Sequence, residues 1–161
     1  MTKVMFIIIC CICASVLVLS SCESEKAENT PDPTPQTEFV ASDADFENFR
    51  SWTIIKQLDR ALSDDGRAHT DAARTIWIKQ AGATRSQNGQ YPNGTILVKE
   101  VQGGYGIVAM VKRGGSFNSN HQGWEWFRLD SGGKISSRNS SSLCNNCHAQ
   151  EKDQDYVFTK N

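Results

Sequence analysis

The sequence lacks several features that would assign it to common classes of protein. Its 17 Lys and Arg are balanced by 18 Asp and Glu, for a formal net charge of −1, so no basic excess points to nucleic acid. It has no internal repeat. Its one long apolar run, residues 4–18, is shorter than the roughly 20 residues that a membrane-spanning helix needs. These absences leave an ordinary globular domain behind an unusual N-terminus.

The apolar run at the N-terminus is typical of an export signal. A basic residue precedes it, and small residues, Ser20 and Ser21, come directly before Cys22. This arrangement resembles the lipobox of bacterial lipoproteins, in which the cysteine is acylated and the bond before it is cut. We therefore assign residues 1–21 as a lipoprotein signal peptide and predict that the mature chain starts with a lipidated cysteine.

The segment after the lipidated cysteine is a predicted tether. Residues 22–36 are rich in Ser, Glu, Asn, Thr and Pro, a composition typical of a disordered or polyproline-like linker. The folded domain is expected over residues 37–161. Glu23 stands where an aspartate retains many lipoproteins at the inner membrane. We therefore expect an anchor in the cell envelope, facing the periplasm from the outer membrane rather than the inner one.

The folded part is predicted to be an α+β domain built mainly on an antiparallel sheet. Apolar residues at near-helical spacing predict a helix over residues 43–52. Later runs are β-branched or alternating, and Gly and Asn clusters separate them, as in a meander of hairpins. The predicted strands are residues 74–79, 95–101, 106–112 and 124–129. A second short helix is expected near the C-terminus.

The motif that indicates chemistry is Cys144-Asn145-Asn146-Cys147-His148. Two cysteines separated by two residues and followed by histidine can bond one haem covalently and ligate its iron. The alternatives are a zinc half-site or a structural disulfide. A zinc site would need further ligands, and His69 and His121 are isolated in the sequence rather than paired at a ligand spacing. A disulfide would not require the histidine. The predicted cofactor is one covalently bound haem c, with Cys144 and Cys147 as attachment residues and His148 as the axial ligand.

Several segments in order resemble the cytochrome P-460 family, which includes the β-sheet cytochromes c′ (cytochrome c′-beta). The resemblance covers residues 46–159, most of the mature chain. Its most specific pieces are Arg74-Thr75-Ile76-Trp77-Ile78, Tyr91-Pro92-Asn93-Gly94-Thr95-Ile96-Leu97-Val98-Lys99-Glu100, Gly123-Trp124-Glu125-Trp126-Phe127, the Cys144 to His148 motif, and Asp155-Tyr156-Val157-Phe158-Thr159.

The resemblance implies a mostly antiparallel β domain, a homodimer and a five-coordinate haem with an open sixth position. In the P-460 branch, a lysine of the Gly-Thr-x-x-x-Lys-Glu strand is also bonded to the haem ring, and Lys99 occupies that position. The alternative for Lys99 is a solvated or salt-bridged strand lysine. Members that oxidise hydroxylamine carry a carboxylate on the following strand, where this chain has Val108. This departure leaves an apolar pocket that favours an uncharged ligand such as nitric oxide.

Other residues are expected to play structural roles. Met110 is predicted as an apolar strand residue, His121 as an exposed loop residue and His69 as a polar loop residue. Glu125 either points outward or is a paired carboxylate near the pocket, and the alternation of strand residues favours the outward orientation. The four tryptophans are expected to pack in the core or against haem.

The predicted function is that of a membrane-tethered haem protein that binds or slowly oxidises nitric oxide or hydroxylamine, as a possible haem oxidoreductase. One alternative is an electron-transfer or redox-sensing cytochrome without turnover, exchanging electrons with a partner cytochrome. An open sixth site favours the first hypothesis, and a six-coordinate low-spin iron favours the second. A third is a zinc-binding or disulfide-bonded structural lipoprotein.

Overall fold

The computed structural model describes residues 37–58, 73–103, 106–139 and 142–158. All of these residues belong to one compact unit. The predicted signal peptide, Cys22, the tether and His69 lie outside the described residues. Within the described ranges, no helix has the length and apolar character to span a membrane.

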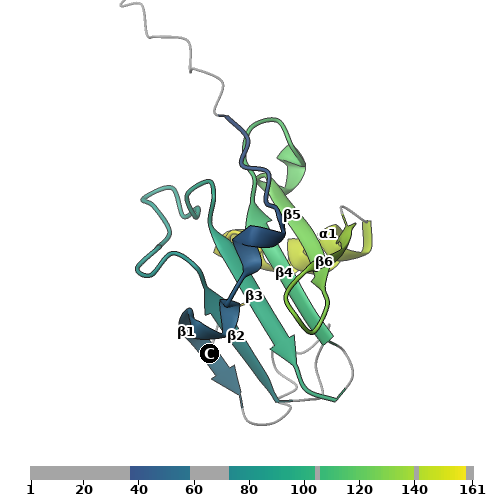
Figure 1. The fold of residues 1–161 in the computed structure, drawn as a ribbon. Helices are drawn as coiled ribbons and strands as arrows, with labels where there is room; N and C mark the ends of the chain where they lie inside the picture. Colours follow the sequence, from purple (N-terminus) through teal and green to yellow (C-terminus); the bar gives the residue numbers. More distant parts are fainter. Residues whose placement is uncertain (1–36, 59–72, 104–105, 140–141, 159–161) are drawn as a thin grey trace, which may run out of the picture. The chain divides into compact units, whose positions relative to one another are not determined.

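Six strands form a single antiparallel sheet in sequence order, which confirms the predicted meander. Figure 1 shows them side by side from β1 to β6. The strands are β1 (Thr53–Leu58), β2 (Arg74–Ile78), β3 (Ile96–Val101), β4 (Gly106–Lys112), β5 (Trp124–Leu129) and β6 (Ile135–Asn139). The two outer strands were not predicted. β6 has the sequence Ile-Ser-Ser-Arg-Asn, whose polar residues are typical of a loop, and it becomes a strand because it pairs with β5.

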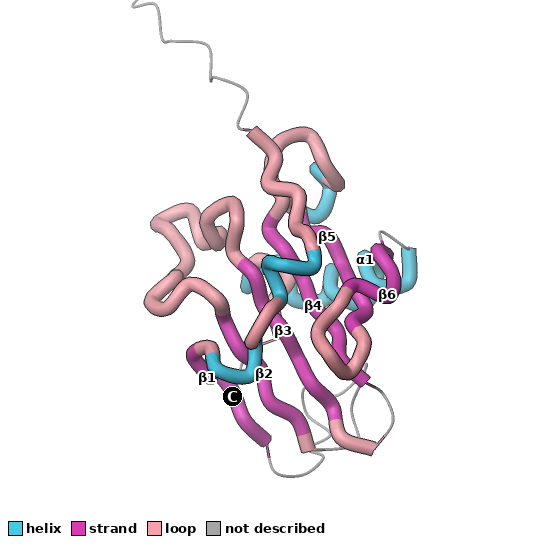
Figure 2. The backbone as a smooth tube through the Cα atoms, viewed as in Figure 1, coloured by secondary structure: helices cyan, strands magenta, loops and turns pink. Residues whose placement is uncertain are grey.

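The prediction of an N-terminal helix over residues 43–52 is wrong. The segment instead forms two 3₁₀ helices, η1 (Asp43–Phe46) and η2 (Phe49–Ser51), drawn in cyan in Figure 2. Asn48 separates them with a left-handed φ of 54°. The apolar residues Phe46 and Phe49 are three positions apart, and this spacing suits a three-residue helical repeat as well as an α-helix. Both side chains are buried in the core.

The two faces of the sheet are covered by the two ends of the described chain. In Figure 1 the blue segment with η1 and η2 lies in front of the sheet, and the yellow segment lies behind it. The yellow segment contains α1 (Ser142–His148) and the 3₁₀ helix η4 (Ala149–Gln154). The expected C-terminal helix is therefore confirmed. We call the face under η1 and η2 the N-terminal face, and the face under α1 and η4 the motif face.

Each face has its own apolar cluster because successive strand residues point to opposite sides. The two clusters contain different strand residues. The cluster of the N-terminal face includes Phe46, Phe49, Trp77, Ile96, Val98, Ile107, Ala109, Val111, Phe127 and Leu129. The cluster of the motif face includes Ile78, Leu97, Met110, Trp124, Trp126, Tyr156 and Val157, with Cys144 and Ala149 packed against it.

Candidate haem site

The predicted attachment residues lie on α1, directly against the motif face. Cys144, Cys147 and His148 are three and four positions apart along this helix, so they share one side of it. Both cysteines are thiols and are partly buried. Cys144 packs against the apolar cluster of the motif face. The helix therefore presents two thiols and an imidazole from one side.

The orientation of His148 is fixed by a backbone carbonyl. Its Nδ1 lies 2.6 Å from the carbonyl oxygen of Tyr156, and a carbonyl can only accept, so Nδ1 donates the proton. The lone pair of the neutral ring is then on Nε2, the nitrogen available to a metal. The ring also packs against Trp126, at a centroid distance of 4.2 Å, and edge-on against Phe158, at 5.0 Å. This arrangement matches that of a histidine metal ligand, whose second nitrogen is held by a hydrogen bond.

The protonation state of His148 also suits iron ligation. Burial lowers its pKa to about 4; the hydrogen bond to the Tyr156 carbonyl opposes this shift, and the nearby positive charge of Lys99 adds to it. The imidazole is therefore neutral at neutral pH, which is the form that binds a metal ion.

Helix α1 is held on the sheet through the side chain of Asn145. Its Oδ1 accepts hydrogen bonds from Trp126 Nε1, at 2.7 Å, and from Asn118 Nδ2, at 3.0 Å. Asn118 also donates to the carbonyl oxygen of Trp124, at 2.8 Å. Asn145 is one of the two variable positions inside the motif, so its role could not be identified from the motif pattern. The contact fixes the distance between the attachment helix and strand β5.

Lys99 lies on the motif face, as a haem cross-link would require. Strand register places Ile76, Lys99, Val108 and Arg128 side by side across β2 to β5. Lys99 is also near enough to affect the pKa of His148. Val108 pairs directly with Lys99, so these two predicted residues do come together on the sheet.

The two faces of the described strands differ in their acidic residues. The charged strand residues that register assigns to the motif face are all basic: Lys56, Arg74, Lys99, Lys112 and Arg128. The acidic strand residues Glu100 and Glu125 belong to the N-terminal face. Haem carries two anionic propionates, so a basic face suits it better than an acidic one.

The expectation that Glu125 points outward is wrong. Its side chain is buried, and it pairs with Arg138 Nη1 at 3.0 Å and with Arg113 Nη1 at 3.6 Å. Alternation along β5 places it on the N-terminal face. Two arginines from neighbouring segments compensate the buried carboxylate, and this pairing could not be inferred from β5 alone.

The structure also places Met110, His121 and the four tryptophans, to which the sequence assigned structural roles. Met110 is a buried strand residue, as predicted, and it belongs to the cluster beneath α1. His121 is only partly exposed: its Nδ1 lies 3.2 Å from Asn118 Oδ1, and its ring packs against Tyr156 at 5.4 Å. The tryptophans divide evenly, with Trp52 and Trp77 on the N-terminal face and Trp124 and Trp126 on the motif face.

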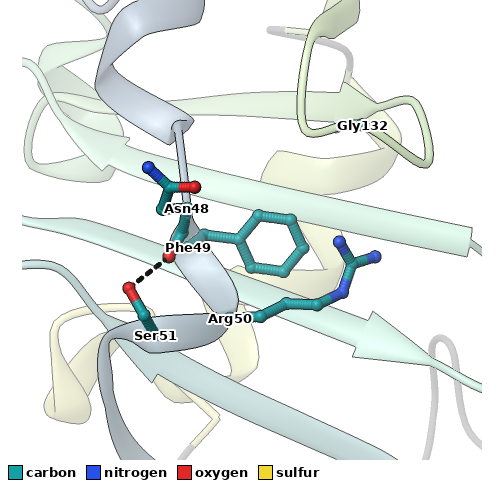
Figure 3. Close-up of a pocket in the computed structure, with 5 residues that line it drawn as sticks. All are labelled: Asn48, Phe49, Arg50, Ser51 and Gly132. Atoms are coloured by element: carbon teal, nitrogen blue, oxygen red, sulfur yellow. Dashed lines mark hydrogen bonds between the residues drawn. The ribbon is translucent and has the colours of Figure 1, made fainter.

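In the described part of the chain, no three His, Cys, Asp or Glu side chains are grouped so that they could hold a metal ion. A pocket lined by Asn48, Phe49, Arg50, Ser51 and Gly132 is shown in Figure 3. It lies on the N-terminal face, where Arg50 binds Glu100 at 2.6 Å and the carbonyl oxygen of Ser131 at 3.3 Å. This pocket is on the opposite side of the sheet from the motif.

The family model described as Cytochrome P460 matches residues 102–159. This segment contains β4, β5, β6 and α1, and therefore the Cys144 to His148 motif. The family suggests a c-type haem protein, and haem is the cofactor that it implies. The match of residues 102–159 to the cytochrome P460 family confirms the resemblance inferred from the sequence over this segment. No curated protein matches the chain.

Proposed function

We propose that the chain carries one covalently bound haem c and uses it to bind, or slowly oxidise, small nitrogen compounds such as nitric oxide or hydroxylamine. The observation that carries this proposal is the hydrogen bond from His148 Nδ1 to the Tyr156 carbonyl, which leaves Nε2 available to iron. Cys144 and Cys147 supply the thioether bonds. Lys99 is the candidate for a further bond to the ring.

Haem supplies an iron that binds small ligands and exchanges electrons. The chain determines how that iron is held. Trp126 and Phe158 pack on the imidazole of His148 and limit its rotation. Asn145 connects the attachment helix to β5, which fixes the helix relative to the sheet. Basic residues on the motif face offset the negative charge of the propionates.

The residue facing Lys99 favours binding over rapid turnover. Val108 pairs with Lys99 and has no group that can accept a proton. The described strands place no carboxylate on the motif face, because Glu100 and Glu125 both belong to the other face. Oxidation of hydroxylamine requires removal of protons, and it is slow without a general base in reach. An uncharged diatomic ligand such as nitric oxide needs no such base.

The first experiment is an absorption spectrum of the oxidised and reduced protein, recorded with the intact mass after denaturation. A mass increment of one haem confirms covalent attachment. A colourless protein, made in a host that exports it and attaches haem, contradicts the proposal. A high-spin spectrum supports an open sixth position, whereas a six-coordinate low-spin spectrum favours the electron-transfer alternative.

The same spectrum distinguishes the two roles of Lys99. A strongly red-shifted reduced Soret band, for which the P460 family is named, indicates that Lys99 is bonded to the ring. Lys99→Arg should then restore an ordinary c-type spectrum, because a guanidinium does not replace the amine in this bond. Lys56→Arg is the matched control, since Lys56 is a lysine on the same face but on the edge strand β1. An unchanged spectrum in Lys99→Arg identifies Lys99 as a strand lysine.

We further propose that acylated Cys22 anchors the protein in the cell envelope, at the outer membrane facing the periplasm. The sequence of residues 4–22 supports this proposal. Cys22→Ala should abolish labelling by radioactive palmitate and release the protein from the membrane fraction. Labelling that persists in this variant would contradict the anchor.

A homodimer is also proposed, with a partner cytochrome as the electron donor or acceptor. The edge strand β1 supports the dimer, because Ile54 and Ile55 are 51% and 37% exposed there. An exposed apolar edge strand is a site at which a second copy can pair. Ile54→Lys should shift the protein toward monomer in sedimentation analysis, and a monomeric wild type would contradict the proposal.

A further inference from the structure

A buried ion pair lies beneath the turn that contacts His148. Lys112, the last residue of β4, places its Nζ 2.6 Å from Asp155 Oδ1. Their side chains are 2% and 0% exposed. Burial lowers the pKa of Lys112, and the ion pair with Asp155 opposes that shift. Buried ion pairs are often no more stable than apolar residues of similar size, so stability alone is a weak reason for this pair.

The carboxylate of Asp155 is held from two directions. Oδ1 accepts from Lys112 Nζ, and Oδ2 accepts from the backbone N–H of Tyr91 at 2.7 Å. These bonds connect the residue to β4 and to the segment before β3. Asp155 and Tyr156 have consecutive positive φ values of 52° and 63°. Non-glycine residues rarely adopt this conformation, so the turn needs external contacts to hold it.

The turn contacts the candidate haem site through one backbone carbonyl group. The carbonyl oxygen of Tyr156 accepts the proton of His148 Nδ1, at 2.6 Å. The side chain of Tyr156 is anchored separately, because its hydroxyl donates to the carbonyl oxygen of Asn120 at 3.0 Å. The position of the carbonyl therefore depends on the backbone of the turn. This backbone is held by its own hydrogen bonds, such as Tyr156 N–H to the Glu151 carbonyl at 2.8 Å, and by the side-chain contacts of Asp155 to Lys112 and Tyr91.

We propose that Lys112 and Asp155 are positioning residues for the axial histidine. The pair holds the turn in the conformation that aims the Tyr156 carbonyl at Nδ1. A strong hydrogen bond from Nδ1 increases the electron donation of the imidazole to iron and fixes its orientation. This inference rests on the proposed function, in which His148 ligates haem. It assigns a role to two residues outside the attachment motif.

The test compares haem-loaded wild-type protein with Lys112→Met/Asp155→Asn, which removes both charges without leaving one unpaired in the core. Weaker hydrogen bonding at Nδ1 should shift the iron–histidine stretching band of the reduced protein to lower frequency. It should also raise the midpoint reduction potential, because a poorer donor stabilises ferric iron less. Asp155→Asn alone is nearly isosteric and retains an acceptor for Tyr91, but it leaves the buried Lys112 without its carboxylate, so it should lower the stability of the protein as well as shift both readouts in the same direction.

The matched control is Lys79→Met/Asp45→Asn. This pair, at 3.0 Å, contacts the N-terminal face, so its removal should leave both readouts at wild-type values. A haem-loaded Lys112→Met/Asp155→Asn protein with the wild-type stretching band and potential would overturn the inference while leaving the proposed function intact. A wild-type protein without bound haem would overturn the proposed function, and this inference with it.

Discussion

The two faces of the sheet are packed in different ways, although the same strands supply both. The N-terminal face is filled mainly by aromatic and aliphatic side chains; Arg50 pairs with Glu100 at its rim, at 2.6 Å, and Glu125 is its one buried strand carboxylate among the described residues. The motif face combines an apolar cluster with buried polar contacts, including Trp126 to Asn145 and Lys112 to Asp155. Apolar burial is non-directional, whereas hydrogen bonds fix distances and angles. The first face is suited to stability, and the second to orienting a ligand.

The largest effect is expected when the axial ligand is removed from the motif face. His148→Ala should abolish normal haem ligation and remove the ligand-dependent bands of the absorption spectrum. Cys147→Ala should weaken attachment, because one thioether bond remains through Cys144. His121→Ala is the control, since His121 is the other histidine in the described part and should leave axial ligation intact. Wild-type spectra in both His148→Ala and Cys147→Ala would refute the site assignment.

On the N-terminal face, a large loss of folding stability is expected when a buried aromatic ring is removed. Phe127 is 2% exposed and packs against Phe46 at a centroid distance of 5.3 Å. Phe127→Ala should lower the free energy of unfolding by roughly 3–5 kcal/mol, because it removes a buried ring and leaves a cavity. Denaturant titration measures this loss. The haem spectrum of the remaining folded protein should be unchanged, and a spectral change would mean that the two faces are coupled.

Substitution of Trp126, the neighbour of Phe127 on β5, should change the haem site more than it changes stability. Trp126→Phe keeps an aromatic ring on the motif face but removes the 2.7 Å hydrogen bond to Asn145. The free energy of unfolding should fall by about 1 kcal/mol. The iron–histidine stretching band should shift, because α1 loses its contact with β5. Asn145→Ala should give a similar shift, and the double variant should add little to it. Additive effects of the two changes would contradict this coupling.

The smallest effect is expected at the rim of the N-terminal face. Burial alone would raise the pKa of Asp45, but hydrogen bonds from the Ser42 backbone and Lys79 outweigh it and lower the pKa below 3.8. The carboxylate therefore stabilises the folded state above pH 3.8, and this contribution is lost as the pH falls through the lowered pKa. Asp45→Asn should cost about 0.5 kcal/mol at pH 7, with the difference from wild type vanishing in acid. A cost that persists in acid would contradict this account.

Prediction from sequence succeeded where the pattern was local and regular. The strands near residues 74, 95, 106 and 124 are β-branched or alternating, and all four form β2 to β5. It failed at the ends of the sheet. β6 is polar, and its strand conformation comes from pairing with β5 rather than from its own composition. The helix expected at residues 43–52 is broken at Asn48, because 3₁₀ and α-helical spacing cannot be separated over so few residues.

The residues of the candidate site also divide into those that the sequence predicted and those that only the folded structure shows. The spacing of the motif predicts Cys144, Cys147 and His148 as haem-binding residues, since covalent attachment of haem requires neighbouring residues. The residues that orient His148 are far from one another in the sequence. Lys112 lies on β4, and Asp155 follows η4. No spacing rule connects them, so they are found only when the strands are assembled.

The sequence by itself therefore predicted the attachment motif, the antiparallel strands and the resemblance to the cytochrome P460 family. The tertiary structure decided which face of the sheet receives the motif, which residue opposes Lys99 and which carbonyl accepts the proton of His148. The physical reason is the range of the interactions involved. Covalent motifs and side-chain periodicity act over a few residues, whereas register, burial and hydrogen-bond partners depend on segments that meet only in the folded chain.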